Sequence, residues 1–561
     1  MRKSLTKDLP IIAGIGLPVN RSKLLLWFRL GTLAYSIYFY FTVKVQTFEV
    51  FLSLGLLAFL SLLPAYLWCA GKAHGLPIVP VFTLGFFPSY ILPIQTNSKV
   101  LTGYEPGLQC KALLLASALT AIVTLIWQQL CNDPKSRIPQ VRLLDLERST
   151  WLLVTFMLLG LLFQITGEFF IRFSGGVFSL IRGYTGNGAM LALFVFSFQL
   201  GQGRLGPVLR WMLFVVVGMQ IVVDAASFIL ASTLVKLGVI GAGYTLGSQK
   251  IPWKSGIAAV LMLSVLHAGK ADMRQKYWVE GAQGVSQFGI SDYPQIFFEW
   301  VSGGWKVLKS GISAETQEEI ASAGDRNAMV AVFLRVLDET PAVKPFLNGE
   351  TYQSIPGLLI PRVFNKEKGI AHIGNWILGY YYEFLTLDML GKTSIGFDLM
   401  IEAFANYGTL GVLGLAVVLG LLYGWIGRIS IGVPLLSFRF LLAVVVLSGT
   451  LSSNNTAGVF VTTLWQSLLA LMTINLFLMK TAQNPFFANS VIRQGLNKSE
   501  LTLIQKRELE KSKEKVLAMD SGIKPLAEEP ESSKVRQEKQ KSETVEIKNE
   551  RPQRFVYRNE R

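Results

Sequence analysis

Long apolar runs separated by short polar connections are the feature that most restricts the fold of this 561-residue chain. Most of the runs are about 17 to 25 residues long, which as a helix is enough to cross the roughly 30 Å hydrocarbon layer of a bilayer. The composition agrees, because 51% of the residues are hydrophobic and only 16% are charged. Water-soluble domains would need more charged surface. We therefore expect an all-α polytopic membrane protein.

The apolar runs predict about twelve transmembrane helices, within a range of about 10 to 13. The weakest predictions are 77–94, which contains several prolines, and 254–268, which is short. The predicted spans are residues 24–43, 48–69, 77–94, 109–130, 150–171, 187–201, 210–224, 227–247, 254–268, 399–425, 434–452 and 458–479.

Lysine and arginine residues gather at alternate connections between the predicted spans, and this pattern gives the topology. Cytoplasmic connections carry the positive residues, so both termini are expected in the cytoplasm and the longest connection on the outer face. The expected parts are a cytoplasmic N-terminal segment (1–23), a bundle of about nine spans (24–268), an extracytoplasmic loop domain (269–398), a bundle of about three spans (399–480) and a charged, largely disordered cytoplasmic tail (481–561).

Several classes of function are disfavoured by what the sequence lacks. The net charge of +16 is explained by topology, so we expect no nucleic-acid partner. Three cysteines and three histidines show no zinc-type spacing, and we expect neither a metal nor a cofactor. No phosphate-binding GxxxxGK[ST] loop, HExxH pair or GxSxG elbow is present, which disfavours ATP hydrolysis, zinc proteolysis and a nucleophile-elbow hydrolase.

A few charged residues fall inside the predicted spans, where a charge is costly and needs a partner or a function. Glu168 and Arg172 are four residues apart on one helix and are expected to pair at the outer interface. Asp224 falls in a predicted tight outer turn. Lys236 is placed to reach a lipid headgroup or a carboxylate. These last two residues are candidates for a site within the bundle.

Cations in the long connection are candidates for binding an anion. Arg274 directly follows the ninth predicted span, where it suits either anchoring at the lipid headgroups or anion binding. Arg326 lies in the first turn of an amphipathic helix predicted within 324–341. The helix dipole disfavours a cation there, so Arg326 needs an acidic partner or a ligand. Arg335, near the end of the same helix, is favoured by the dipole.

The segment 345–376 combines proline, glycine and apolar residues in a way typical of a loop packed against the membrane. Arg362 and Lys366 lie on this segment. A guanidinium group can hold a phosphate with two parallel hydrogen bonds, and a lysine adds a point charge. The same cations also suit a rim that contacts lipid headgroups, so both roles are open.

Further candidates lie close to the tenth predicted span. His372 suits a general base, a hydrogen-bond donor or a structural role. Trp376 and Tyr380 belong to an aromatic cluster that suits either the membrane interface or stacking against a sugar ring. Glu402 and Asn406 are one turn apart at the outer end of the span, where a carboxylate is costly unless it is used or paired.

The motifs over 324–425 resemble those of bacterial oligosaccharide repeat-unit polymerases, the O-antigen polymerase (Wzy-like) family. The likeness is carried by an Ile-Pro-Arg motif ending at Arg362 and followed by lysines. It continues in a Thr-Ser pair followed by Gly396, Glu402, Asn406 and Gly408, which leads into the next span. The long charged tail departs from the family but does not touch these motifs.

The resemblance implies metal-independent, inverting glycosyl transfer by a GT-C-like enzyme in surface polysaccharide biosynthesis, at the outer face of a bacterial inner membrane. Its substrate would be an oligosaccharide linked to undecaprenyl pyrophosphate, with a chain-length regulator and a flippase as protein partners. Arg362 would hold the pyrophosphate, with help from Arg326, Arg274 and Lys366. The resemblance leaves open whether Glu402 or His372 deprotonates the acceptor hydroxyl. An O-antigen ligase and a transporter or flippase of lipid-linked sugars are the alternative functions.

Overall fold

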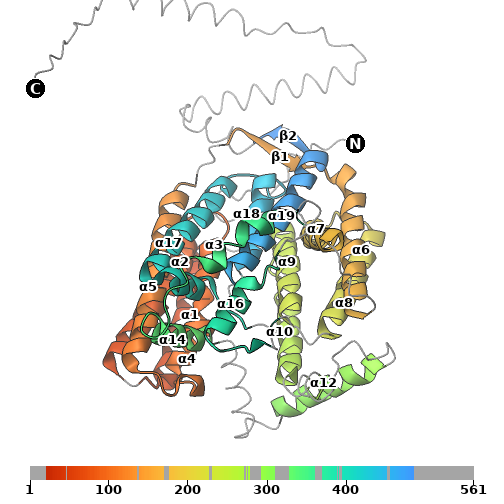
Figure 1. Ribbon diagram of the computed structural model, residues 1–561. Coiled ribbons are helices and arrows are strands. Elements are labelled where there is room, and N and C mark those ends of the chain that lie inside the picture. The colour runs from red at the N-terminus through yellow and green to blue at the C-terminus, as the bar shows by residue number, and fades with distance from the viewer. Residues whose placement is uncertain are drawn as a thin grey trace, which may run out of the picture. The chain divides into compact units, whose positions relative to one another are not determined.

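The computed structural model describes residues 21–45, 47–134, 138–169, 176–226, 230–270, 273, 276–277, 292–309, 328–360, 365, 369–387, 390, 395–450 and 455–484. Helices make up most of these segments (Figure 1). The predicted tail lies outside the described residues apart from its first four positions, and the predicted N-terminal segment is described only from Arg21 onward.

Eight of the described helices are long and apolar enough to cross a membrane, so the chain is a multi-pass membrane protein. Each of the eight coincides with a predicted span. They are α1 (Arg21–Thr42), α2 (Phe48–Cys69), the composite segment Ile78–Gln95, α5 (Pro106–Cys131), α6 (Leu146–Phe169), α8 (Pro207–Ala226), α17 (Leu399–Ser430) and α19 (Ala457–Leu478).

The four other predicted spans also overlap helices, although one of these helices begins at Gly176, eleven residues before the predicted start at 187. These are α7 (Gly176–Gly201), α9 (Leu230–Ser248), α10 (Trp253–Ala268) and α18 (Phe438–Thr450). Helices α10 and α18 are apolar but short. The crossing of the membrane by these four helices stays a prediction.

Prolines divide the composite segment Ile78–Gln95 into three short helices. They are α3 (Ile78–Leu84), the π-type turn η1 (Phe87–Ile91) and α4 (Leu92–Gln95). Proline has no backbone N–H and its ring clashes with the preceding turn, which breaks or kinks a helix. A 3₁₀ turn, η2 (Lys99–Leu101), then leads into α5.

The described residues of the long connection (269–398) include five helical elements. They are α12 (Tyr293–Lys309), α14 (Met329–Glu339), η6 (Glu350–Tyr352), α15 (Ile355–Leu359) and α16 (Ile373–Tyr381). Helix α14 packs on α5 and α17. Met329, Phe333 and Leu337 are buried on its inner face, in agreement with the amphipathic helix predicted there.

Two short strands close one end of the bundle. Strand β1 (Gln140–Leu144) pairs antiparallel with β2 (Met479–Gln483), although neither strand was predicted. The Arg142 guanidinium on β1 donates to the carbonyl oxygens of Asn475 and Met479, at 2.7 and 3.0 Å, and so satisfies the end of α19. The start of α6 and the end of α19 therefore lie at the same end of the bundle, as alternating spans require.

The described helices pack around two main hydrophobic clusters. One lies among α2, α5, α14 and α17, and the other among α6, α7, α18 and α19, with part of α9. Helices α7 and α9 approach very closely at Gly243 and Gly247. A Cβ at Gly247 would lie only 2.1 Å from the carbonyl oxygen of Phe198. This spacing of small residues allows helix backbones to meet in a membrane.

Candidate functional site

Helix α17 is broken at Tyr407 and Gly408, beside the predicted site residues. Tyr407 has φ −137° and ψ 15°, and Gly408 has φ 60° and ψ −146°. A Cβ at Gly411 would lie 2.1 Å from the carbonyl oxygen of Ala403. Residues eight apart in a straight helix are about 12 Å apart, so residues 399–406 fold back on the rest of α17. The predicted span over 399–425 is therefore present in α17 but contains a kink that was not predicted, because glycine allows the chain to turn at position 408.

Glu402 lies on this folded-back segment and is completely buried. Its Oε2 accepts a hydrogen bond from the backbone N–H of Ala457, the first residue of α19. A carboxylate is favourable at that position because the positive end of the helix dipole lies there. Its Oε1 makes no hydrogen bond of normal geometry among the described residues, although the Thr351 hydroxyl lies near the carboxylate. A Cβ at Gly374 of α16 would lie 3.3 Å from Oε1, so α16 closes the site on that side.

Asn406 is also fully buried, and its amide is fully engaged. Its Nδ2 donates to the Thr351 hydroxyl at 2.9 Å and to the carbonyl oxygen of Glu402 at 2.8 Å. Its Oδ1 accepts from the backbone N–H of Gly349 at 2.9 Å. These bonds clamp the loop that contains η6 to the break in α17. A saccharide-binding role for Asn406 stays a prediction, and it requires some of these bonds to open.

Other polar residues of the same region were not predicted from the sequence. The hydroxyl of Thr456, which precedes α19, donates to Asn375 Oδ1 at 2.6 Å. Asp398 caps the start of α17 by accepting from the backbone N–H of Ile401 at 2.8 Å, and it also accepts from the Tyr90 hydroxyl. An aspartate directly before an apolar helical run is a recognisable capping signal. The hydrogen bond between Asp398 and Tyr90 joins residues 308 positions apart, so no local sequence pattern could predict it.

Helix α16, whose Gly374 lies against Glu402, carries the predicted Trp376 and Tyr380. His372 is exposed and directly precedes the helix without capping it through its side chain. Trp376 is half-buried and Tyr380 is 50% exposed. The last two are one turn apart and lie on the same side of α16. Gly374, two residues after His372, lies against the Glu402 carboxylate, so the two candidate bases belong to one region.

The rest of the predicted aromatic cluster is part of the packing. Tyr382 is fully buried and its hydroxyl bonds to that of Thr340 at 2.8 Å. Burial raises the pKa of Tyr382 to about 12. The Tyr381 hydroxyl donates to the carbonyl oxygen of Pro345 at 2.7 Å. Tyr380 is therefore the more open of the tyrosines on this stretch.

The four cations predicted to bind pyrophosphate, Arg274, Arg326, Arg362 and Lys366, lie outside the described residues. Two described cations of the connection, Arg335 and Lys344, are already paired. Lys344 Nζ lies 2.8 Å from Glu339 Oε2 and 3.0 Å from Glu383 Oε1. Burial lowers the pKa of Lys344, but these two hydrogen bonds outweigh it and the pKa is raised.

Arg335 is also held by direct contacts in addition to the predicted helix dipole. Its Nε lies 2.8 Å from Glu339 Oε1, and its guanidinium stacks 5.0 Å from the centre of the Phe384 ring. Arg335 and Lys344 therefore form an ion-pair cluster with acidic residues, which does not resemble an open anion site.

Asp224 and Lys236, predicted as candidates within the bundle, form a buried ion pair. Lys236 Nζ on α9 lies 2.8 Å from Asp224 Oδ2 on α8. Gln164 on α6 bridges them, with Nε2 donating to Asp224 at 2.5 Å and Oε1 accepting from Lys236 at 3.2 Å. Asp224 belongs to the last turn of α8 and not to the predicted turn after it. The side chains of Glu168 and Arg172 lie outside the described residues.

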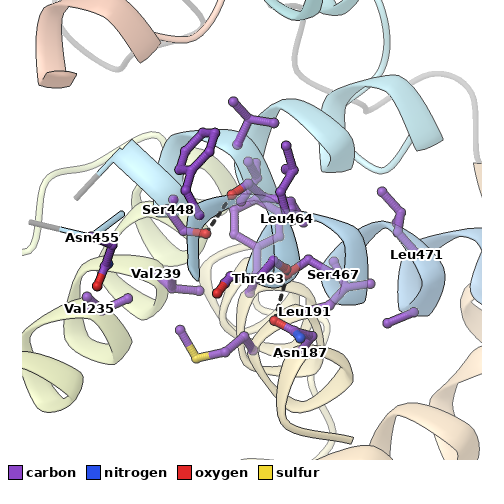
Figure 2. Close-up of a pocket in the computed structure, with 18 residues that line it drawn as sticks. Asn187, Leu191, Val235, Val239, Ser448, Asn455, Thr463, Leu464, Ser467 and Leu471 are labelled. Carbon is purple, nitrogen blue, oxygen red and sulfur yellow. Dashed lines mark hydrogen bonds between the residues drawn. The ribbon is translucent and has the colours of Figure 1, made fainter. Parts of the chain in front are cut away.

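A cavity of about 220 Å³ lies between helices α7, α9, α18 and α19. Figure 2 shows Asn187 and Ser467 joined across it, with a hydrogen bond of 2.7 Å from the Ser467 hydroxyl to Asn187 Oδ1. Its lining residues are mostly apolar and none is ionisable. A cavity of this chemistry suits hydrocarbon. Phe460 lines it and also a small cavity beside Asp398, so one aromatic ring borders both spaces.

Comparisons of this chain with protein-family models, with curated proteins and with solved structures find no match. Within the described segments, no group of three or more histidine, cysteine, aspartate or glutamate side chains is placed to hold a metal ion. The resemblance to the polymerases therefore depends on the motif residues themselves. Of these, Glu402 and Asn406 share one buried network.

Proposed function

We propose that this protein polymerises oligosaccharide repeat units linked to undecaprenyl pyrophosphate, at the outer face of a bacterial inner membrane. The observation that carries the proposal is Glu402, a completely buried carboxylate whose Oε1 lies near the Thr351 hydroxyl but makes no hydrogen bond of normal geometry in the described part of the chain. Removing a carboxylate from water costs on the order of several kcal/mol, unless a partner or a bound ligand compensates for the lost hydration. The motif that resembles the polymerases contains this glutamate.

In this proposal Glu402 is the general base. The acceptor hydroxyl oxygen forms a bond to the anomeric carbon of the donor sugar, and its proton passes to Glu402 Oε1. The bond from that carbon to the pyrophosphate breaks, and the lipid pyrophosphate leaves. Arg362, with Lys366, Arg326 and Arg274, would stabilise the charge that develops on it.

The acceptor would reach Glu402 from the side of α16. Gly374 is the residue that adjoins Oε1, and Trp376 and Tyr380 lie two and six residues further along the same helix. Their rings would stack on the sugar as it enters. Because Glu402 is completely buried, the first turn of α16 has to move before the proton is transferred. His372, exposed at the start of the same helix, is the competing base.

The proposed orientation has both termini in the cytoplasm. At the β1–β2 end of the bundle, Arg142 caps α19 and Arg428 pairs with Asp133 at 3.3 Å. A positive cluster at short connections marks the cytoplasmic side. The opposite helix ends, which include Glu402 and Ala457, would then face outward. Twelve spans and an extracytoplasmic loop domain complete this arrangement.

The test is the length distribution of lipid-linked glycans, measured by mass spectrometry of lipid extracts. A probe that cannot cross the membrane separates the two leaflets. If deletion of the protein leaves single repeat units on the outer leaflet, it is a polymerase. Single units held on the inner leaflet would make it a transporter. Polymer of normal length that is not passed to its final acceptor would make it a ligase.

Variants in the deletion strain then test the site. Glu402→Gln removes the base and keeps the size of the side chain, so single units should accumulate as in the deletion. Glu350→Gln is the matched control, because Glu350 is an exposed glutamate of the same connection. Arg362→Ala should likewise abolish polymerisation while the protein remains inserted. Normal polymer in Glu402→Gln, with loss in His372→Gln, would assign the base to His372.

A further inference from the structure

Helix α12 carries two apolar faces, one covered by the protein and one uncovered. One face packs against the end of α10, where Trp300 is fully buried and its Nε1 donates to the carbonyl oxygen of Leu266 at 2.8 Å. A Cβ at Gly304 would lie 2.1 Å from the carbonyl oxygen of Val265. This close approach fixes α12 at the end of α10 (Figure 1).

The other face of α12 is apolar and uncovered. Phe298 is 76% exposed, Val301 48% and Trp305 59%. Their spacing of three and four residues places them on one side of the helix, away from Trp300 and Gly304. No part of the chain that the structure describes covers them. Apolar surface left in water costs about 25 cal/mol per Å², so this face needs an apolar environment.

Charged groups line the edge of the same helix. Lys306 and Lys309 lie in its last turn and are exposed. The acidic residue of the helix, Glu299, is already bound, because it pairs with Lys276 at 2.5 Å and accepts from the Tyr277 hydroxyl at 2.9 Å. The side-chain hydrogen bond from Lys276 lowers the pKa of Glu299. The uncovered face is therefore bordered by positive charge.

The length of α10 indicates what the uncovered face meets. Helix α10 has 16 residues, which gives it a length of about 24 Å, less than the roughly 30 Å hydrocarbon layer. It exposes apolar residues such as Val260 and Leu261, as a helix in contact with lipid does. A helix packed on the end of such a short span lies in the headgroup layer or at its boundary with the acyl chains.

We infer that α12 is an interfacial membrane helix, and that its partner is the lipid bilayer. Phe298, Val301 and Trp305 enter the boundary between headgroups and acyl chains, and Lys306 and Lys309 contact the phosphate groups of the lipids. Aromatic and basic residues together are typical of helices that lie in this layer. The inference holds whatever reaction the protein performs.

The test is the depth of spin labels on the full chain reconstituted in phospholipid nanodiscs. Labels are placed at Phe298→Cys and Trp305→Cys, with Cys69, Cys110 and Cys131 replaced by alanine. Gln295→Cys is the matched control, since Gln295 is exposed on the polar edge of the same helix. Power saturation with oxygen and with a water-soluble nickel chelate reports whether each label lies in lipid or in water.

The expected result is that labels at 298 and 305 are more accessible to oxygen than to the nickel chelate, while the label at 295 shows the reverse. Equal access of nickel to all three positions would place the face in water and overturn the inference. Labels at 298 and 305 that neither reagent reaches would show that protein covers the face, which overturns it as well. Size-exclusion profiles that match the parent chain confirm that the labelled variants are folded.

Discussion

Lys236 on α9 and Asp224 on α8 form an ion pair of 2.8 Å, and their side chains are only 15% and 6% exposed. The carboxylate also accepts from the Thr233 hydroxyl at 3.2 Å, and Gln164 of α6 bonds to both charged groups. The pair therefore links three helices through one satisfied polar network. The contribution of the pair to the free energy of unfolding requires both partners, because either charge alone would be costly to bury.

Removal of the lysine alone should strongly destabilise the protein. Lys236→Met leaves Asp224 buried without its cation, which costs about 3–5 kcal/mol of unfolding free energy. The double variant Lys236→Met/Asp224→Leu should recover most of this loss, since no charge then remains. Thermal unfolding of the purified protein in detergent measures both. Lys250→Met, at an exposed lysine after α9, is the control and should change little. A double variant as unstable as the single one would contradict the prediction.

The break in α17 should depend on Gly408. Gly408→Ala places a side chain at φ 60° and ψ −146°, and its Cβ would lie 2.9 Å from Phe346 Cζ. We expect a loss of about 1–3 kcal/mol from the backbone conformation, with the clash adding to it. Gly414→Ala on the same helix meets no atom within 4 Å and should stabilise by about 0.5–1 kcal/mol. Equal melting temperatures for the two variants would show that the turn does not need glycine.

Asn406 should hold the η6 loop against α17. Asn406→Ala leaves the Gly349 N–H and the Thr351 hydroxyl without this partner, at a cost of about 1–3 kcal/mol. Hydrogen–deuterium exchange of peptides covering 345–352 should become faster. Asn406→Asp keeps the acceptor for Gly349 and should show a smaller effect. Gln353→Ala serves as the control, because Gln353 directly follows η6, is exposed and has a right-handed backbone conformation, with φ −59°. An unchanged rate of exchange in Asn406→Ala would show that the Asn406 side chain does not hold the η6 loop against α17.

Asp145, between β1 and α6, should make stability depend on acidic pH. A hydrogen bond from Lys480 is the main cause that lowers its pKa below the usual 3.8. An acid with a lowered pKa stabilises the fold above its unfolded pKa, and the contribution is lost as pH falls through the lowered value. The melting temperature of the wild type should therefore exceed that of Asp145→Asn near pH 6, and the difference should shrink below about pH 4. In a Lys480→Gln background, the difference in melting temperature caused by Asp145→Asn should be smaller at pH 6 as well. A difference that widens on acidification would contradict the prediction.

The positions of the helices were predictable from the sequence, whereas their connections through space were not. The run 48–69 was predicted and found with the same bounds, because the length and hydropathy of a span are local properties. The Ala457 N–H that binds Glu402 lies 55 residues further along the chain, and no local pattern indicates it. The sequence also marks Glu402 as a costly carboxylate at a span end, and the structure buries this residue completely.

Two features were missed for different physical reasons. Strands β1 and β2 are short and half-polar, and only their pairing with each other makes them strands. The break at Tyr407 and Gly408 lies in an apolar stretch, where a single glycine in a helical pattern is usually tolerated. It turns the chain here because Phe346 and the η6 loop pack against it.

The pairing of β1 with β2 also imposes an order on synthesis. Gln140 aligns with Gln483, so the first strand leaves the ribosome more than three hundred residues before its partner. Until α19 is inserted, β1 has no partner strand and Arg142 has no helix end to cap. A chain that stops before Met479 would keep all of its spans and still lack this closure. We expect the pairing of β2 (Met479–Gln483) with β1 to be a late step of assembly, which takes place only after the preceding helices are inserted.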